Sequence, residues 1–441
     1  MSQSTTVQAP VMKHPRGLAT LFFTEMWERF SYYGMRAFLI LYMTAPAAAG
    51  GLGFSDQDAA SIYGTYTGSA WAAAILGGLA GDRWLGQYRS VLIGGIIIAL
   101  GHFTLAFPQL PFFYAGLSFI VIGTGLLKPN VSTLVGSLYE QGDARRDAGF
   151  SVFYMGINLG AFMGPLIAGW LAQRVDWHAG FAAAGFGMAL GLTQYVLGKR
   201  HLQPALNRLA VKPTTTAATT TSSERFTATE SKRVGAIVVL FFFASLFWGA
   251  YEQAGSTLNL FADRYTRLSV FGFSFPSSWF QSVQPMFVIL LAPVFAWLWI
   301  RLGHHQPSSP AKFAYGLFFV GLAFLVLVPA ATFAQSGEGM RVSPWWLVWA
   351  LFLTELGELC LSPVGLSVVT KLSPARIVGL MMGVWFLSNA LGNKLAGWAA
   401  GFFSTLPLTT LFGMVAAITL AAAFVLFLLV RPVKRLMGGV L

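Results

Sequence analysis

Apolar stretches long enough to cross a lipid bilayer recur throughout this chain of 441 residues. A membrane-spanning helix needs about 20 predominantly apolar residues. Twelve stretches qualify, over residues 18–44, 56–82, 89–107, 112–138, 148–172, 178–198, 234–262, 276–300, 312–334, 344–370, 376–403 and 408–430. Only 10% of the residues are charged, against about 25% in soluble domains. The sequence therefore predicts an all-α membrane protein with twelve transmembrane helices, and it excludes a soluble globular fold.

Lysine and arginine are distributed unequally over the loops between these stretches. When the connections are numbered alternately, 20 Lys and Arg residues lie on one side and 4 on the other. Because cytoplasmic loops are enriched in Lys and Arg, both termini and the central loop are predicted to be cytoplasmic. The net charge of +12 then reflects membrane topology, so no nucleic-acid partner is expected. We expect a multi-pass protein of the cytoplasmic (inner) membrane.

The loop over residues 201–233 is rich in Thr and Ser and poor in apolar residues. Such a composition cannot form a hydrophobic core and is typical of a flexible linker. It divides the chain into residues 1–200 and 234–441, each with six predicted helices. Two six-helix bundles around a polar site are the arrangement of the major facilitator superfamily. The segment Gly77–Arg89 resembles that superfamily's signature after the second helix, in which Asp82 is expected to pair with arginines.

Four ionisable side chains interrupt the first predicted helix: Glu25, Glu28, Arg29 and Arg36. Each charge placed at the bilayer centre would cost roughly 2.5 to 3.5 kcal/mol. At about 100° per residue, these four side chains and Tyr32 fall within an arc of roughly 100°. One face of the helix can therefore hold all five side chains away from lipid. Such an inward-facing charged surface is a candidate functional site.

Four more ionisable residues lie inside later spans: Lys128, Glu252, Glu355 and Glu358. Together with the first helix they provide three cations and five anions. Such groups persist in a bilayer by pairing with one another or by lining water. An excess of carboxylates beside cations suits proton coupling, because a proton and a cation compete for the same carboxylate. A cavity that carries both signs also suits a zwitterionic substrate.

Four segments in order along the chain carry a family resemblance: Glu25–Gly34, Phe153–Gly160, Phe247–Gln253 and Gly357–Ser367. The first has the pattern Glu-x-x-Glu-Arg-Phe-x-Tyr-Tyr-Gly, and the second has Phe-Tyr-x-x-Ile-Asn-x-Gly. These segments resemble signature motifs in the first, fifth, seventh and tenth helices of proton-dependent oligopeptide transporters, the POT family of the major facilitator superfamily. The resemblance extends over nearly the whole chain.

The resemblance implies a proton-coupled symporter that imports di- and tripeptides by alternating access, with protons as coupling ion and no other cofactor. It implies that Arg36 and Lys128 bind the peptide carboxylate and that Glu358 binds its amino group. It also implies two ion pairs, Arg36 with Glu252 and Lys128 with Glu358. The remaining implied substrate-binding residues are Tyr32, Asn158, Trp248, Gln284 and Trp385. The implied proton-coupling residues are Glu25, Glu28, Arg29 and Glu252, and a functional monomer is expected.

Some positions depart from the family pattern or have no assigned role. Gln284 stands where members often have Asn, and Trp71 stands where they often have an aromatic hydroxyl. Tyr63 or Tyr66 can supply that hydroxyl instead. The roles of Glu355 and Lys394 stay open, and His102 is expected to be an interior histidine with satisfied hydrogen bonds.

Peptide transport has two alternatives. A carrier of the same fold could move a non-peptide substrate, such as nitrate, an amino-acid conjugate or a drug. An anion carrier could dispense with Glu358, whereas a peptide site needs this acid as well as both cations. An intramembrane enzyme is not expected, because the sequence has no serine elbow with a matched histidine and no metal-ligand spacing.

Overall fold

The computed structural model describes residues 13–140, 143, 145–210, 226–337, 339–374 and 377–438. This part of the chain contains twelve helices of 19 residues or more. They are α1 (Arg16–Thr44), α2 (Asp56–Ala80), α3 (Gln87–Leu105), α4 (Leu110–Ser137), α5 (Arg145–Gly164), α7 (Trp177–Leu197), α9 (Ala228–Tyr251), α11 (Val283–Leu302), α12 (Ser309–Ala334), α13 (Trp345–Leu372), α14 (Val378–Ala400) and α15 (Leu408–Leu436). The predicted all-α membrane fold is confirmed.

Nine helical segments in the described residues are long and apolar enough to cross a membrane. They correspond to nine of the twelve predicted spans. The other three predicted spans coincide with α1, α2 and α14, whose polar residues lower their mean hydropathy. In α1 these are the charged residues of the inward face, and in α14 they include the buried Asn389 and Asn393. The full count of twelve crossings therefore stays a prediction for these three helices.

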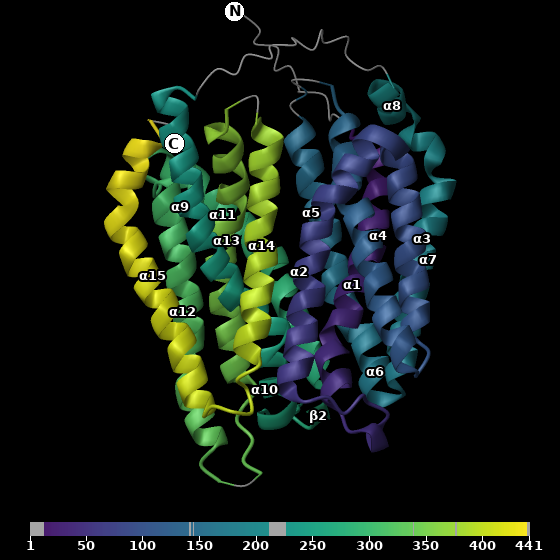
Figure 1. Cartoon of the computed structure of the whole chain (residues 1–441), viewed down its shortest axis with the longest axis vertical. Coiled ribbons are helices and arrows are strands. Elements are labelled where there is room, and N and C mark those ends of the chain that lie inside the picture. Colours follow the sequence, from purple (N-terminus) through teal and green to yellow (C-terminus); the bar gives the residue numbers. More distant parts are fainter. Residues whose placement is uncertain are drawn as a thin grey trace, which may run out of the picture.

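The helices form two groups that lie side by side (Figure 1). The helices from α1 to α8 (Lys199–Ala210) form one group, here called the N-terminal half, and α9 to α15 form the C-terminal half. Within the first half α3 packs on α4, and α1 packs on α5 and α7; within the second, α12 packs on α13 and α15. The halves contact each other mainly through α14 with α2 and through α11 with α5. Polar residues on α1 can therefore face either their own half or its partner.

The predicted flexible linker is shorter than residues 201–233. Residues Lys199–Ala210 form helix α8, because Leu202 and Ala205 are buried while the charged side chains point outward, an amphipathic pattern. At the other end Thr227 caps α9: its hydroxyl accepts from the backbone N–H of Glu230 at 3.1 Å. The prediction of a linker was wrong at both ends, and residues 211–225 lie outside the described part.

Several helices are interrupted at the end of the molecule where α1 ends and α2 begins. A π-helical turn, η3 (Pro165–Gly169), joins α5 to α6 (Trp170–Arg174), and a 3₁₀ turn, η4 (Glu252–Gly255), joins α9 to α10 (Thr257–Tyr265). The hairpin of β1 (Ser269–Val270) and β2 (Phe273–Ser274) and the 3₁₀ turn η5 (Ser277–Ser282) precede α11. The remaining 3₁₀ and π turns are η1 (Ala47–Ala49), η2 (Gly81–Leu85) and η6 (Gly303–His305). The break after α9 places Glu252 where the two halves meet.

Glycine allows the backbones of α2 and α14 to approach closely. A Cβ atom added to Gly64 would lie 2.8 Å from the Cα of Gly397, so neither position has room for a side chain. Small residues at helix crossings are the usual means of close packing in membrane proteins. This contact joins the two halves near the interrupted helix ends.

Candidate functional site

Three charged residues of α1 form a buried group, here called the α1 cluster: Glu25, Glu28 and Arg29. Their exposed fractions are 2%, 0% and 3%. The Arg29 Nε atom lies 2.9 Å from Glu25 Oε1 and 2.6 Å from Glu28 Oε2, the second contact being an ion pair without hydrogen-bond geometry. Among the described residues, Glu25 Oε2 and both Glu28 oxygens lack a hydrogen-bond partner. Two carboxylates thus share one guanidinium and keep oxygens free to accept a proton.

Arg36 and Glu252 form an ion pair between the halves, here called the inter-half pair. The Arg36 Nη2 atom donates to Glu252 Oε2, and both side chains are buried. Arg36 Nε also donates to the Tyr63 hydroxyl at 2.5 Å. Its guanidinium carbon lies 5.8 Å from the ring centroid of Tyr33 and 5.7 Å from that of Tyr63. The predicted ion pair is therefore present, and of Tyr63 and Tyr66 it is Tyr63 whose hydroxyl bonds to Arg36.

Tyr32 connects the α1 cluster with the inter-half pair along one face of α1. It is buried, and the Arg29 guanidinium carbon lies 5.6 Å from its ring centroid. On its other side the ring stacks on Tyr66 at 6.4 Å between centroids, with 29° between the planes. The hydroxyl of Tyr66 is buried without a hydrogen-bond partner among the described residues. The side chains grouped by helical period in the sequence are thus all buried, and Tyr32 lies next to Arg29 on this face.

Lys128 does not pair with Glu358, so this part of the prediction was wrong for this structure. Its Nζ atom lies 3.0 Å from the ring centroid of Trp71, in a cation–π contact. No carboxylate lies within ion-pair distance of Lys128 in the described part of the chain. Glu358 belongs to the other half and is buried, with Oε2 unpartnered among the same residues. Because Trp71 stands on the same half as Lys128, it offers a partner that does not depend on how the halves meet.

Glu355 lies in the C-terminal half, three positions before Glu358 on α13, and is held by a hydrogen bond within that half. It is fully buried, and the hydroxyl of Tyr251 donates to its Oε1 at 2.8 Å. On the preceding residue, the Thr354 hydroxyl accepts from Gln284 Nε2 at 3.3 Å. Tyr251 was not among the predicted site residues, although the motif places its aromatic hydroxyl next to Glu252.

The other predicted binding residues are buried at α5, α9 and α14. Asn158 uses one amide hydrogen for its own helix, donating to the Tyr154 carbonyl at 3.0 Å. Trp248 is 7% exposed, and its indole Nε1 has no hydrogen-bond partner in the described residues. Trp385 packs edge-on against Phe313, with 5.9 Å between the ring centroids. Unpartnered buried donors such as the Trp248 indole are positions where a ligand could supply the missing acceptor.

The halves are joined by polar contacts at the end where α1 ends and α2 begins, here called the closed end. Arg264 of α10 binds Asp56 of α2 with both nitrogens, at 2.7 Å and 2.6 Å. The Asn259 side chain donates to the Ala37 carbonyl at 2.7 Å. Gln173 Nε2 donates to a hydroxyl beyond α10, Ser277 Oγ, at 2.8 Å.

Lys394, whose role stayed open, contributes to the same junction. Its Nζ atom donates to Thr65 Oγ1 at 2.6 Å, linking α14 to α2. At the opposite end of α2, the predicted ion pairs of Asp82 are not formed among the described residues. Asp82 instead accepts a hydrogen bond from Gln87 Nε2 at 2.9 Å. The polar contacts between the halves are therefore concentrated at the closed end.

His102 of α3 differs from the expected interior histidine. It is fully buried, and neither ring nitrogen has a hydrogen-bond partner in the part of the chain that the structure describes. The expectation of satisfied hydrogen bonds was wrong for this residue. Among the described residues no group of three His, Cys, Asp or Glu could hold a metal ion.

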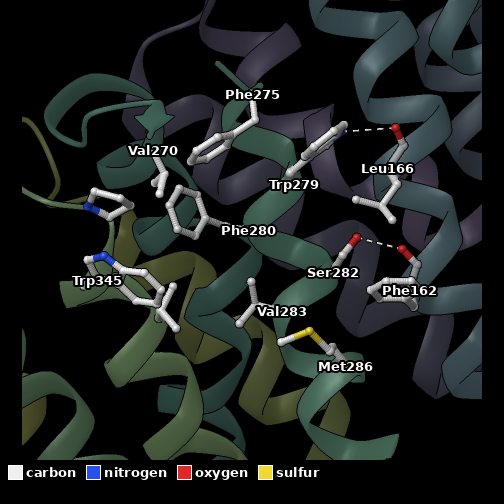
Figure 2. A pocket seen from close by; sticks show the side chains of 12 residues that line it. Phe162, Leu166, Val270, Phe275, Trp279, Phe280, Ser282, Val283, Met286 and Trp345 are labelled. Atoms are coloured by element: carbon white, nitrogen blue, oxygen red, sulfur yellow. Dashed lines mark hydrogen bonds between the residues drawn. The ribbon is translucent and has the colours of Figure 1, made fainter. Parts of the chain in front are cut away.

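An apolar pocket of about 280 Å³ lies between the halves but away from the charged groups (Figure 2). Its walls include Phe162 and Leu166 of the α5–α6 segment, Trp279 and Ser282 of η5, and Trp345 of α13. The hydrogen bonds in Figure 2 run from Trp279 Nε1 to the Leu166 carbonyl at 3.1 Å and from Ser282 Oγ to the Phe162 carbonyl at 2.7 Å. No ionisable residue lines it. This pocket therefore contains none of the charged groups of the α1 cluster or the inter-half pair.

Comparisons with known proteins agree with this arrangement. The model of the POT family matches residues 88–208 and 206–419. The chain is 40% identical to the peptide transporter YePEPT of Yersinia enterocolitica subsp. palearctica, covering 97% of this chain and 96% of that one. It is 35% identical to the di-/tripeptide transporter of Lactococcus lactis subsp. cremoris, covering 97% of each.

A solved structure shows the same fold at similar sequence identity. It is that of a point mutant of a peptide transporter POT in complex with alafosfalin. The TM-score is 0.87 at 40% identity, and the match covers 98% of each chain. On its sequence and on its fold, this chain belongs to the POT family.

Proposed function

We propose that this chain is a proton-coupled symporter that imports di- and tripeptides by alternating access. The observation that carries the proposal is the inter-half pair of Arg36 and Glu252, buried where the halves meet. A carboxylate that holds a cation releases it when protonated, so the cation becomes available for a substrate carboxylate. The peptide substrates named for the relatives from Yersinia enterocolitica and Lactococcus lactis support the same interpretation.

The proton is proposed to act through the α1 cluster as well as through Glu252. Glu25 and Arg36 are 11 positions apart, which corresponds to about 16 Å along a helix. They are therefore too far apart for direct contact, and Tyr32 lies between them. The coupling is then a free energy shared by two sites on one rigid helix face, and it acts in both directions.

The substrate is proposed to lie between the halves, with opposite charges at its two ends. Arg36, once released from Glu252, would bind the peptide carboxylate, together with Lys128 once its ammonium group leaves the Trp71 ring. Glu358, with one oxygen unpartnered among the described residues, would bind the amino group from the other half. A free amino acid also carries both charges, but it is shorter than a dipeptide and would not span the halves as well. Tyr32, Asn158, Trp248, Gln284 and Trp385 would shape the walls.

The closed end is proposed to face the outside of the cell. The predicted positive-inside topology supports this orientation, because Lys and Arg gather at the opposite end. In this orientation both termini are cytoplasmic, the membrane is the bacterial inner membrane and the contacts of Asp56 with Arg264 close the external side. A monomer contains every group named in the mechanism. No cofactor besides the proton and no enzymatic step is required.

Uptake into proteoliposomes with an imposed pH gradient tests the proposal. Dialanine and trialanine are expected to accumulate when the interior is alkaline, and free alanine is expected to accumulate far less. Equal rates with and without the gradient would contradict proton coupling. Trialanine and other dipeptides are expected to compete with dialanine for uptake. A lack of competition would contradict a general peptide site.

A further inference from the structure

A second pocket lies where α1, α7 and α8 meet, apart from the α1 cluster and the inter-half pair. It encloses about 690 Å³ and is bordered by residues of all three helices. In Figure 1, α7 and α8 lie at the outer edge of the N-terminal half, away from the C-terminal half. The pocket therefore faces the surroundings of the protein rather than the route between the halves.

One side of this pocket is cationic. Arg16 begins α1, and Arg200 and His201 lie in the first turn of α8. In the part of the chain that the structure describes, none of the three has a carboxylate within 4.0 Å. By contrast Arg208, on the same helix α8, donates to the Leu138 carbonyl at 2.9 Å and pairs with Glu140. The cations of the pocket thus remain available to an anion.

The other side of the pocket is apolar and faces outward. Phe23 is 44% exposed, Leu190 is 53% exposed and Leu197 is 74% exposed, and the half-buried Trp27 lies between α1 and α7. Large apolar side chains left open on a membrane helix face lipid chains. None of the described residues that line the pocket is acidic. Its polarity therefore changes from cationic to apolar along one direction, as that of a phospholipid changes from headgroup to acyl chain.

The walls of this pocket are fixed by close contacts between helices. A Cβ atom on Gly17 would lie 2.7 Å from the His201 carbonyl oxygen, and one on Gly198 would lie 2.4 Å from Thr20 Cγ2. Gln194 closes the base, because its Nε2 donates to the Thr20 carbonyl at 3.2 Å. The pocket is thus part of the folded N-terminal half and not a gap between mobile side chains.

We propose that this pocket binds one anionic glycerophospholipid, with its phosphate at Arg16 and Arg200 and an acyl chain along Phe23 and Leu190. A basic pocket between membrane helices at the cytoplasmic end is a typical site for such headgroups. A zwitterionic lipid fits less well, because its amine or choline group finds no carboxylate in the lining. The proposal uses the membrane topology but not the identity of the transported substrate.

Native mass spectrometry of the purified full-length protein tests the site. The protein is mixed with equal amounts of phosphatidylglycerol and phosphatidylcholine that carry the same acyl chains. One phosphatidylglycerol is expected to be retained over phosphatidylcholine by at least about threefold. The double variant R16Q/R200Q is expected to lose this preference. The control K434Q/R435Q removes two exposed cations at the end of α15 and is expected to retain it.

Two results would overturn the proposal: equal retention of both lipids by the unmodified protein, or an undiminished preference in R16Q/R200Q. Displacement of the lipid by millimolar inorganic phosphate would also overturn it, because the site would then recognise only the anion. A photoreactive phosphatidylglycerol gives a second measurement that needs no variant. It is expected to label α1, α7 and α8, and labelling confined to other helices would exclude this pocket.

Discussion

The α1 cluster and the inter-half pair use the same kinds of side chain in opposite ways. Glu25, Glu28 and Arg29 lie within four positions on one helix, so their contacts persist however the halves move. Arg36 and Glu252 belong to different halves, so their contact depends on the relative position of the halves. The comparison fits the proposal that the cluster is a fixed proton-binding group, whereas the pair responds to both proton and substrate.

Removing the cation of the inter-half pair has the largest expected effect. Arg36→Gln leaves Glu252 buried without its partner, which typically costs about 3–5 kcal/mol, and removes the proposed carboxylate ligand. Both gradient-driven uptake and counterflow of dialanine are expected to fall by about 100-fold or more. Arg36→Lys keeps the charge but loses the second donor to Tyr63, and it is expected to retain part of the counterflow.

A thermal unfolding curve accompanies these variants. It separates loss of the folded protein from loss of transport. Counterflow near the unmodified rate in a folded Arg36→Gln protein would contradict the role of the pair in substrate binding.

Changing the partner of Lys128 is expected to have an intermediate effect. Trp71→Leu removes a cation–π contact worth about 0.5–2 kcal/mol, so Lys128 is released for the substrate carboxylate. The KM for dialanine is expected to fall by about two- to tenfold. Trp71→Phe keeps a weaker aromatic face, so its KM for dialanine should lie between those of the unmodified protein and Trp71→Leu. A KM that rises in both variants would show that Trp71 supports binding instead of competing with it.

The contact at the closed end is expected to matter least. Asp56→Asn removes the charge of this ion pair but leaves an amide oxygen that can still accept a hydrogen bond from Arg264, whose side chain is partly exposed to solvent. The turnover rate is expected to change by about two- to threefold. Asp58→Asn is the matched control, because Asp58 lies in the same first turn of α2 but bonds only to Ser55 in the described residues. Equal turnover rates in the two variants would show that the ion pair of Asp56 with Arg264 does not contribute to closure of the external side.

The sequence predicted most features that lie on one helix, and it was less reliable for contacts between helices. The apolar pattern gave most of the spans to within a few residues, with larger differences at α9 and α11, where turns interrupt the apolar stretch. The helical period grouped Glu25, Arg29 and Arg36 on one buried face. The family resemblance added Glu252 as the partner of Arg36. The pairing of Lys128 with Glu358 failed because it requires a particular position of the halves, and Trp71 provides a nearer partner.

The remaining surprises have similar causes. Helix α8 was missed because half of its twelve residues are polar and only Leu202 and Ala205 are fully buried, with Leu206 and Leu209 partly buried beside them. The bond from Tyr251 to Glu355 was missed because the two residues are 104 positions apart. Such contacts become visible only once α9 and α13 are packed together.

The most direct test of the comparison is the ratio of gradient-driven uptake to counterflow in Glu25→Gln. Counterflow needs the substrate site but no net proton movement, whereas driven uptake needs both. Driven uptake is predicted to fall by at least about tenfold, or ~1.4 kcal/mol of coupling, while counterflow stays within about twofold of the unmodified protein. Glu140→Gln, a change at the exposed surface, serves as control. Intact driven uptake in Glu25→Gln, or equal loss of both activities, would contradict a fixed proton-binding group on α1.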